Sequence, residues 1–160
     1  MTINVTTTMN PIDVIKKDIV DYINAQPYFQ GINCIWDEAG DVDTQILARV
    51  NAIGIGILVE CVKGKVEFKA VGSQAMEMTV TITIEENVMV NRDPGNASAS
   101  GKKATDILCE LFALFNPIEA AQRGEGLPFT VDDYDLVRNT GGRIIYQITG
   151  TAKAGWKLKQ

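Results

Sequence analysis

Hydrophobic and polar residues alternate along residues 76–85, and this alternation predicts a β-strand. The apolar positions are Met76, Met78, Val80, Ile82 and Ile84. A two-residue period is typical of a strand with one buried face and one face in solvent. A polar segment follows at residues 91–100, and a strongly apolar helix is predicted over residues 104–115. We expect this strand, loop and helix to form the centre of the fold.

A second amphipathic helix is predicted near the start of the chain. Its apolar residues recur at helical spacing: Ile12, Ile15, Ile19 and Ile23. Asn10 and Pro11 are typical of a helix N-cap and of the first helical position, and the helix should end before Pro27. A shorter helix is predicted over residues 44–52, where Gly54 provides a C-terminal stop.

Further segments have the composition of strands. They cover residues 31–36, 55–62, 66–71, 134–138 and 143–153. Tight turns are predicted at residues 63–65 and 139–142, and the Gly- and Pro-containing residues 117–128 are expected to be a loop with one helical turn. The fold class is therefore α+β, with a mostly antiparallel sheet of about five to six strands and two main helices packed on one face.

Length and composition favour a single domain over residues 1–160, with a flexible arm at residues 1–9 and a basic tail at residues 153–160. A chain of this size buries roughly 70% of its unfolded surface, which is enough for a stable core without metal or disulfides. The N-terminal segment has neither a basic start nor an apolar stretch, so no signal peptide is predicted. No stretch approaches about 18 consecutive apolar residues, so we expect a cytoplasmic protein with no membrane contact.

The sequence offers little that catalysis requires. It contains no histidine, which removes Ser-His-Asp, Cys-His and histidine-ligated metal sites. Its three cysteines are far apart, a pattern typical of buried thiols in a reducing compartment. The acidic residues 37–43 do not match a calcium loop, because Val42 and Ala48 stand where glycine and glutamate are needed. We therefore predict no enzyme activity, no cofactor and no metal site.

Charge is distributed unevenly along the chain, whose net charge is −5. From residue 143 onward the chain has four basic residues and no acid, whereas residues 37–43 and 110–135 are acidic. One interpretation is a solubilising tail. The other is a head-to-tail contact in which a basic edge of one subunit meets an acidic patch of the next and closes a ring. The contact residues at the basic end would be Lys153, Trp156, Lys157 and Lys159, with Trp156 as the anchor.

Several segments, taken in order, resemble one protein family. They are residues 55–62 with the charged turn that follows, residues 82–87 (Ile-Thr-Ile-Glu-Glu-Asn), residues 90–92 (Val-Asn-Arg) with the loop after them, and the apolar helix over residues 104–115. In this pattern and in size, residues 10–151 are similar to the tail terminator (tail-completion) proteins of long-tailed phages and prophages. Related neck and head–tail joining proteins share the same pattern.

The resemblance implies a structural protein that assembles as a ring, usually of six copies, on the last ring of the tail tube. Such a protein ends tube polymerisation, so its partners would be further copies of itself, the tail-tube protein and the head-connector protein. It would be cytoplasmic during assembly and then part of the virion. Asn91, Arg92 and Asp93 in the polar loop are then candidate subunit or tube contacts. An acidic lumen would let DNA pass without sequence-specific binding.

Two other interpretations remain open. A small-molecule-binding or enzymatic domain would have a cleft near residues 117–128, where Arg92 or Arg138 could hold an anionic ligand. A baseplate or other structural tail protein would differ from a terminator only in its partners.

Overall fold

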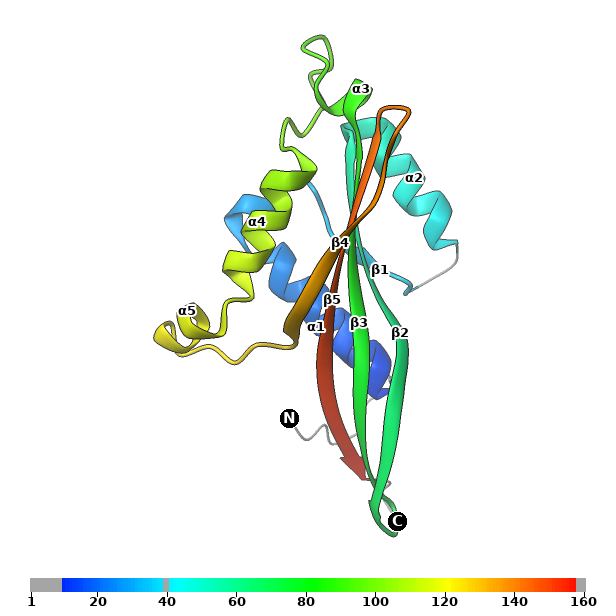
Figure 1. Cartoon of the computed structure of the whole chain (residues 1–160), viewed down its shortest axis with the longest axis vertical. Helices are drawn as coiled ribbons and strands as arrows, with labels where there is room; N and C mark the ends of the chain where they lie inside the picture. Colours follow the sequence, from blue (N-terminus) through cyan, green and yellow to red (C-terminus); the bar gives the residue numbers. More distant parts are fainter. Residues whose placement is uncertain (1–9, 39–40, 158–160) are drawn as a thin grey trace.

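A five-stranded sheet, in the order β1-β2-β3-β5-β4, runs through the length of the molecule (Figure 1). The computed structural model describes residues 10–38 and 41–157. In chain order the elements are α1 (Pro11–Asn24), the 3-10 helix η1 (Pro27–Phe29), β1 (Ile35–Trp36), α2 (Val42–Ile53), β2 (Ile55–Ala70), β3 (Ser73–Asn87), α3 (Val88–Asn91), α4 (Ala104–Leu114), α5 (Pro117–Gln122), β4 (Thr130–Thr140) and β5 (Arg143–Lys157). All strand pairs are antiparallel except β1 with β2. The predicted α+β class with a mostly antiparallel sheet is therefore confirmed.

Local capping signals explain where α1 and α2 begin and where α2 ends. Asn10 caps α1, because its side chain accepts a hydrogen bond from the backbone N–H of Asp13 at 2.9 Å. Asp41 caps α2 in the same way and accepts from the N–H of Thr44 at 3.1 Å, so this helix begins earlier than its apolar pattern predicts. Gly54 ends α2 in the left-handed conformation, with φ at 84°. Both predicted helices are confirmed.

The predicted turn at residues 63–65 is wrong, because β2 continues through it for 16 residues in all. These residues pair with residues 77–79 of β3, and a β-bulge just before them absorbs a change in register. Gly64 suits this position, since a Cβ atom there would lie 2.9 Å from the carbonyl oxygen of Glu77. The chain turns at Gly72, where φ is 70°.

Residues 153–157 of the predicted basic tail form the end of β5. They pair with residues 73–77 of β3, and Lys153 Nζ lies 3.6 Å from the Glu77 carboxylate. The long partner strand decides this outcome, because it offers backbone hydrogen bonds that keep the chain extended.

Several predicted features fall outside the described residues. They include the N-terminal arm, residues 1–9, and the contact residue Lys159. The backbone of Trp156 and Lys157 belongs to β5, whereas the side chains of these two residues are also outside the described part.

The hairpin near the C-terminus is confirmed, and its strands are longer than predicted. β4 and β5 turn at Gly141 and Gly142, where φ is 62° and 74°. The apolar helix after the polar loop is α4, also as predicted. Of the strand predicted over residues 31–36, only the last two residues form β1.

Different helices cover the two faces of the sheet. On one face, α1 and α4 pack against apolar side chains that alternate along β2, β3 and β5; the chief ones, all 0% exposed, are Ile57, Val59, Val80, Ile82, Ile84 and Ile148. α2 packs on the opposite face, where Ile46 and Val50 cluster with Leu58. Figure 1 shows this arrangement, and it shows the far ends of β2, β3 and β5 extending beyond the helices.

Candidate functional site

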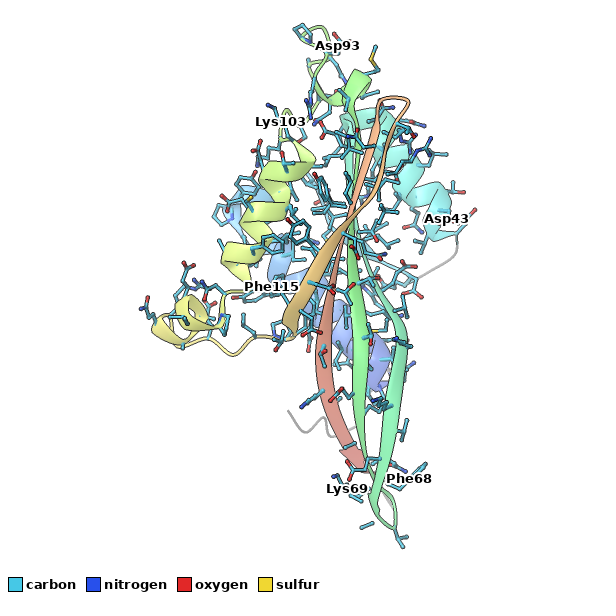
Figure 2. The ribbon with its side chains drawn as sticks, in the orientation of Figure 1. Asp43, Phe68, Lys69, Asp93, Lys103 and Phe115 are labelled. Carbon is cyan, nitrogen blue, oxygen red and sulfur yellow. The ribbon has the colours of Figure 1, made fainter. Side chains whose placement is uncertain are left out.

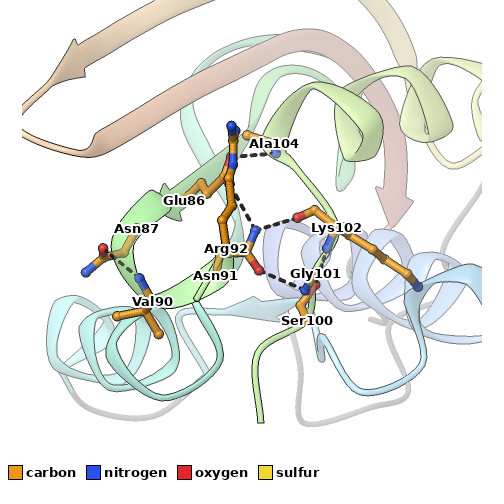
Figure 3. A network of polar contacts seen from close by, with 9 residues as sticks. All are labelled: Glu86, Asn87, Val90, Asn91, Arg92, Ser100, Gly101, Lys102 and Ala104. Carbon is orange, nitrogen blue, oxygen red and sulfur yellow. Dashed lines mark hydrogen bonds and ion pairs between the residues drawn. The ribbon is translucent and has the colours of Figure 1, made fainter. Parts of the chain in front are cut away.

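The polar loop between α3 and α4 is attached to the sheet by the buried carboxylate of Glu86 (Figure 3). The Glu86 side chain is 0% exposed. Its oxygens accept hydrogen bonds from Asn91 Nδ2, Arg92 Nε and the backbone N–H of Ala104, each at 2.9 Å. The bond from Ala104 places a negative charge at the N-terminus of α4, where the helix dipole favours it. Glu86 therefore joins β3, the loop and α4.

The pKa of Glu86 lies below its usual value of 4.5. Burial by itself would raise the pKa, because the charged form loses water. The hydrogen bonds from Arg92, Ala104 and Asn91 together outweigh burial and hold the carboxylate in its charged form. The base of the loop is therefore a fixed part of the fold.

The expectation that the Asn91 side chain is an exposed contact is wrong, because it is only 2% exposed. Besides its bond to Glu86, Asn91 donates to the carbonyl oxygen of Lys102 at 2.8 Å and accepts from the N–H of Gly101 at 3.0 Å. Gly54 packs directly against it, since a Cβ atom at Gly54 would lie 2.3 Å from Asn91 Cα. Asn91 therefore ties the two ends of the loop together. Because its neighbours in the sequence are polar, the sequence alone does not indicate that Asn91 has this role.

The other two predicted contact residues of the loop reach the surface. Arg92 pairs with Glu86 and keeps 40% of its side chain exposed. Asp93 is exposed and accepts a hydrogen bond from the N–H of Gly95 at 2.8 Å. Figure 2 shows Asp93 at one end of the molecule. Contact of these residues with another subunit or with a tail tube stays a prediction.

The opposite end of the molecule is a projecting arm, which we define as residues 62–77 of β2 and β3 with residues 153–155 of β5. Figure 2 shows Phe68 and Lys69 near its tip, away from the helices. Its exposed apolar side chains are Val62 (56%), Val66 (48%), Phe68 (79%) and Val71 (93%). Because β5 pairs along the hairpin, the arm is a three-stranded continuation of the sheet. Sequence reasoning missed the arm, because Val66 and Phe68 alternate as in an ordinary half-buried strand.

The cleft expected near residues 117–128 does not gather the residues expected to line it. A hollow of about 470 Å³ is lined by Leu127 and Pro128 among others, within the roughly 300–1,000 Å³ of ordinary ligand pockets. A smaller hollow of about 260 Å³ lies beside α5. Neither Arg92 nor Arg138 lines this hollow, and Arg123, which does, is paired with Glu125 at 3.2 Å. A larger hollow of about 690 Å³ lies along the arm, where lysines and glutamates line it together. Arg92 and Arg138, the residues expected to hold an anionic ligand, line none of these three hollows.

Two residues of the acidic segment 37–43 have structural partners. Asp37 Oδ1 lies 2.6 Å from Lys16 Nζ, and Asp41 caps α2. Within residues 10–38 and 41–157, no cluster of His, Cys, Asp or Glu side chains is placed to hold a metal ion.

The expectation of buried cysteines holds only for Cys34. Burial raises the pKa of this thiol, and it raises the pKa of the half-buried Cys61 to about 11. Cys109 is exposed on α4. No nucleophile is therefore activated at Cys34 or Cys61, because a raised pKa keeps a thiol protonated at neutral pH.

No helix in the described part of the chain is long and apolar enough to cross a membrane. No protein-family profile matches the sequence, and no curated protein matches it at a significant level. Function must therefore be inferred from the arm, the sheet and the distribution of charge.

Proposed function

We propose that this protein is a structural component of the tail of a long-tailed phage, of the tail terminator type. It assembles as a ring on the last ring of the tail tube, ends tube polymerisation and presents a surface to the head connector. The observation that carries the proposal is the arm, whose backbone is held by three paired strands and whose tip has exposed apolar side chains. The order of strands, loop and helix described above supports the same conclusion by resemblance.

The arm has the properties of an assembly contact. Single exposed apolar residues are ordinary, whereas several on one projecting hairpin are typical of an interaction site. Phe68 is 79% and Val71 is 93% exposed. Full burial of one such side chain stabilises a contact by roughly 1.5–3 kcal/mol, so the tip can contribute several kcal/mol to binding a tube subunit.

The two faces of the sheet suit the inside and outside of a ring. In this proposal α1 and α4 are the two main helices and form the outer layer. On the opposite face, part of which α2 covers, the central strands have half-buried polar residues; they include Thr79, Thr83, Gln147 and Thr149. Since basic residues supply most of the affinity for DNA, a polar wall in a chain of net charge −5 lets DNA slide past.

The test uses the double variant Phe68→Ser/Val71→Ser. We expect the wild-type chain to form oligomers in size-exclusion chromatography with light scattering, and to bind purified tubes of the tail-tube protein encoded in the same phage genome. The variant should fold normally, because both side chains are exposed, and should lose most of its binding to tubes.

Ile118→Ser is the matched control. Ile118 is 70% exposed on α5, away from the arm, so this variant should bind tubes as well as the wild type does. A wild-type chain that stays a monomer at every concentration and does not bind tubes would contradict the proposal.

A further inference from the structure

The sheet has two long edges on which no strand of the described chain pairs. β4 is the terminal strand, so its outer side is open from end to end. On the other edge, β1 pairs only with Leu58 and Val59 of β2, which leaves residues 61–70 of β2 open. An open edge presents unpaired backbone N–H and C=O groups and is a template for pairing with another chain.

The two open edges have opposite charges. Asp133 and Asp135 are exposed on β4, and Lys63 and Lys65 are exposed on the open part of β2. Among the residues that the structure describes, no ion pair includes any of these four. Both edges also have exposed apolar side chains, namely Tyr134 (52%) and Leu136 (50%) on β4 and Val62 (56%) and Val66 (48%) on β2. Each edge is therefore complementary to the other.

We propose that β4 of one copy pairs antiparallel with the open part of β2 of a second copy, with Asp135 opposite Lys63 and Asp133 opposite Lys65. The contact is head-to-tail, because each copy contributes β4 on one side and β2 on the other. It rests on the ring assembly proposed above and names the surfaces that form it.

All four charged residues lie on one face of the sheet, as this register requires. The face of each residue follows from its pairing partners on β5 and β3. These pairings place all four side chains on the same face as Thr79, namely Asp133, Asp135, Lys63 and Lys65. Residues directly opposite each other in an antiparallel pair point to the same face. Both charge pairs therefore form in a single register.

On the other face, the same register places Tyr134 opposite Gly64, where the absence of a side chain leaves room for its ring. Leu136 then stands opposite Val62, the residue at the β-bulge of β2. A slip of one residue would move every side chain of one strand to the wrong face. Lysines would then oppose these apolar groups, so charge and packing select the same pairing.

The offset between the edges is compatible with a closed ring. Asp135 pairs with Gln147 of β5, and Gln147 pairs with Thr83 of β3, whereas Lys63 pairs with Thr79 of β3. Thr83 and Thr79 are four residues apart on β3, or about 14 Å along the strand. β3, β5 and β4 lie between β2 of one copy and β2 of the next, so these two β2 strands are about 19 Å apart across the sheet. The strands then tilt by about 35°, close to the 35–45° of closed sheets.

Charge reversal in the full chain tests the pairing. Asp133→Lys/Asp135→Lys and Lys63→Glu/Lys65→Glu each place like charges opposite one another. Each double variant should need about tenfold higher concentration for half-assembly, measured by light scattering. A mixture of the two variants should recover assembly, because every contact in an alternating ring again joins opposite charges. Glu110→Lys/Glu119→Lys makes the same charge change as Asp133→Lys/Asp135→Lys, on exposed helix positions, and should assemble like the wild type.

Disulfide trapping tests the register in a Cys61→Ala/Cys109→Ser background, which retains only the buried Cys34. One protein has Lys63→Cys and the other Asp135→Cys. Under mild oxidation, a cross-linked dimer should form when the two are mixed and not in either protein alone, because the contact is head-to-tail. Circular dichroism of each variant checks that the fold is retained.

The outcomes separate this contact from the proposed function. A wild-type oligomer without cross-linking in the mixture, or with no effect of charge reversal, would overturn the β4–β2 contact and leave the ring intact. Cross-linking between copies of only one of the two trapping variants would also overturn it, because it indicates a two-fold symmetric contact. A wild-type chain that never assembles would overturn both the contact and the ring.

Discussion

Glu86→Gln removes the charge on which the loop and the start of α4 depend, with little change in side-chain volume. The carboxylate accepts hydrogen bonds from Asn91, Arg92 and Ala104. A glutamine has one acceptor oxygen and turns its NH₂ group toward these donors, so at least one buried donor loses its partner.

The expected loss is about 2–4 kcal/mol in the free energy of unfolding. Removing one partner of a buried ion pair costs about 3–5 kcal/mol, and a hydrogen bond to a charged group contributes about 1.5–3 kcal/mol. The lower part of the range applies here, because Arg92 is 40% exposed and water can solvate it. For a chain of this size the melting temperature should fall by about 5–15 °C.

The difference between wild type and variant should depend on pH. The pKa of Glu86 is below 4.5 in the folded protein, so its contribution to stability is present above the unfolded pKa and is lost as pH falls through the folded pKa. Glutamine does not titrate. The gap in stability between wild type and variant should therefore be constant near neutral pH and should narrow on acidification below about pH 4.5.

Urea unfolding monitored by tryptophan fluorescence provides the assay, since Trp36 is only 9% exposed. Glu77→Gln is the matched control in the same strand. Its side chain is 51% exposed, so it should change stability by less than about 0.5 kcal/mol. If Glu86→Gln is as stable as Glu77→Gln, or if the gap widens at low pH, the assignment of Glu86 as a charged anchor is refuted.

Two further predictions concern packing and thiols. Gly150→Ala should destabilise the fold by at least about 1–3 kcal/mol in the same assay, because a Cβ atom there would lie 2.1 Å from the Phe129 ring; Gly126→Ala, with open space around it, should have little effect. With a thiol reagent at pH 8, Cys109 should react first and Cys61, with its pKa raised to about 11, much more slowly. Cys34 should react only on unfolding, and rapid titration of more than one thiol in the native protein would contradict the described burial.

The sequence alone predicts those parts of the fold that depend on local chemistry. Asn10 and Pro11 start α1, Gly54 ends α2, and the paired glycines at 141 and 142 form the last turn, because caps and turns involve only neighbouring residues. The alternation along β3 likewise reflects a burial pattern that repeats every two residues.

Only the tertiary structure decides the features on which function is proposed. Residues 63–65 have the sequence of a turn, but they form a strand because they pair with β3. Asn91 lies in a polar segment, but Glu86 and the end of the loop bury it. The opposite charges at positions 63 and 135 lie far apart in the chain, and their significance depends on which strands end the sheet. Such features depend on long-range pairing, which local residue preferences do not encode. The sequence therefore predicts the class of fold, and the tertiary structure determines its arm and its open edges.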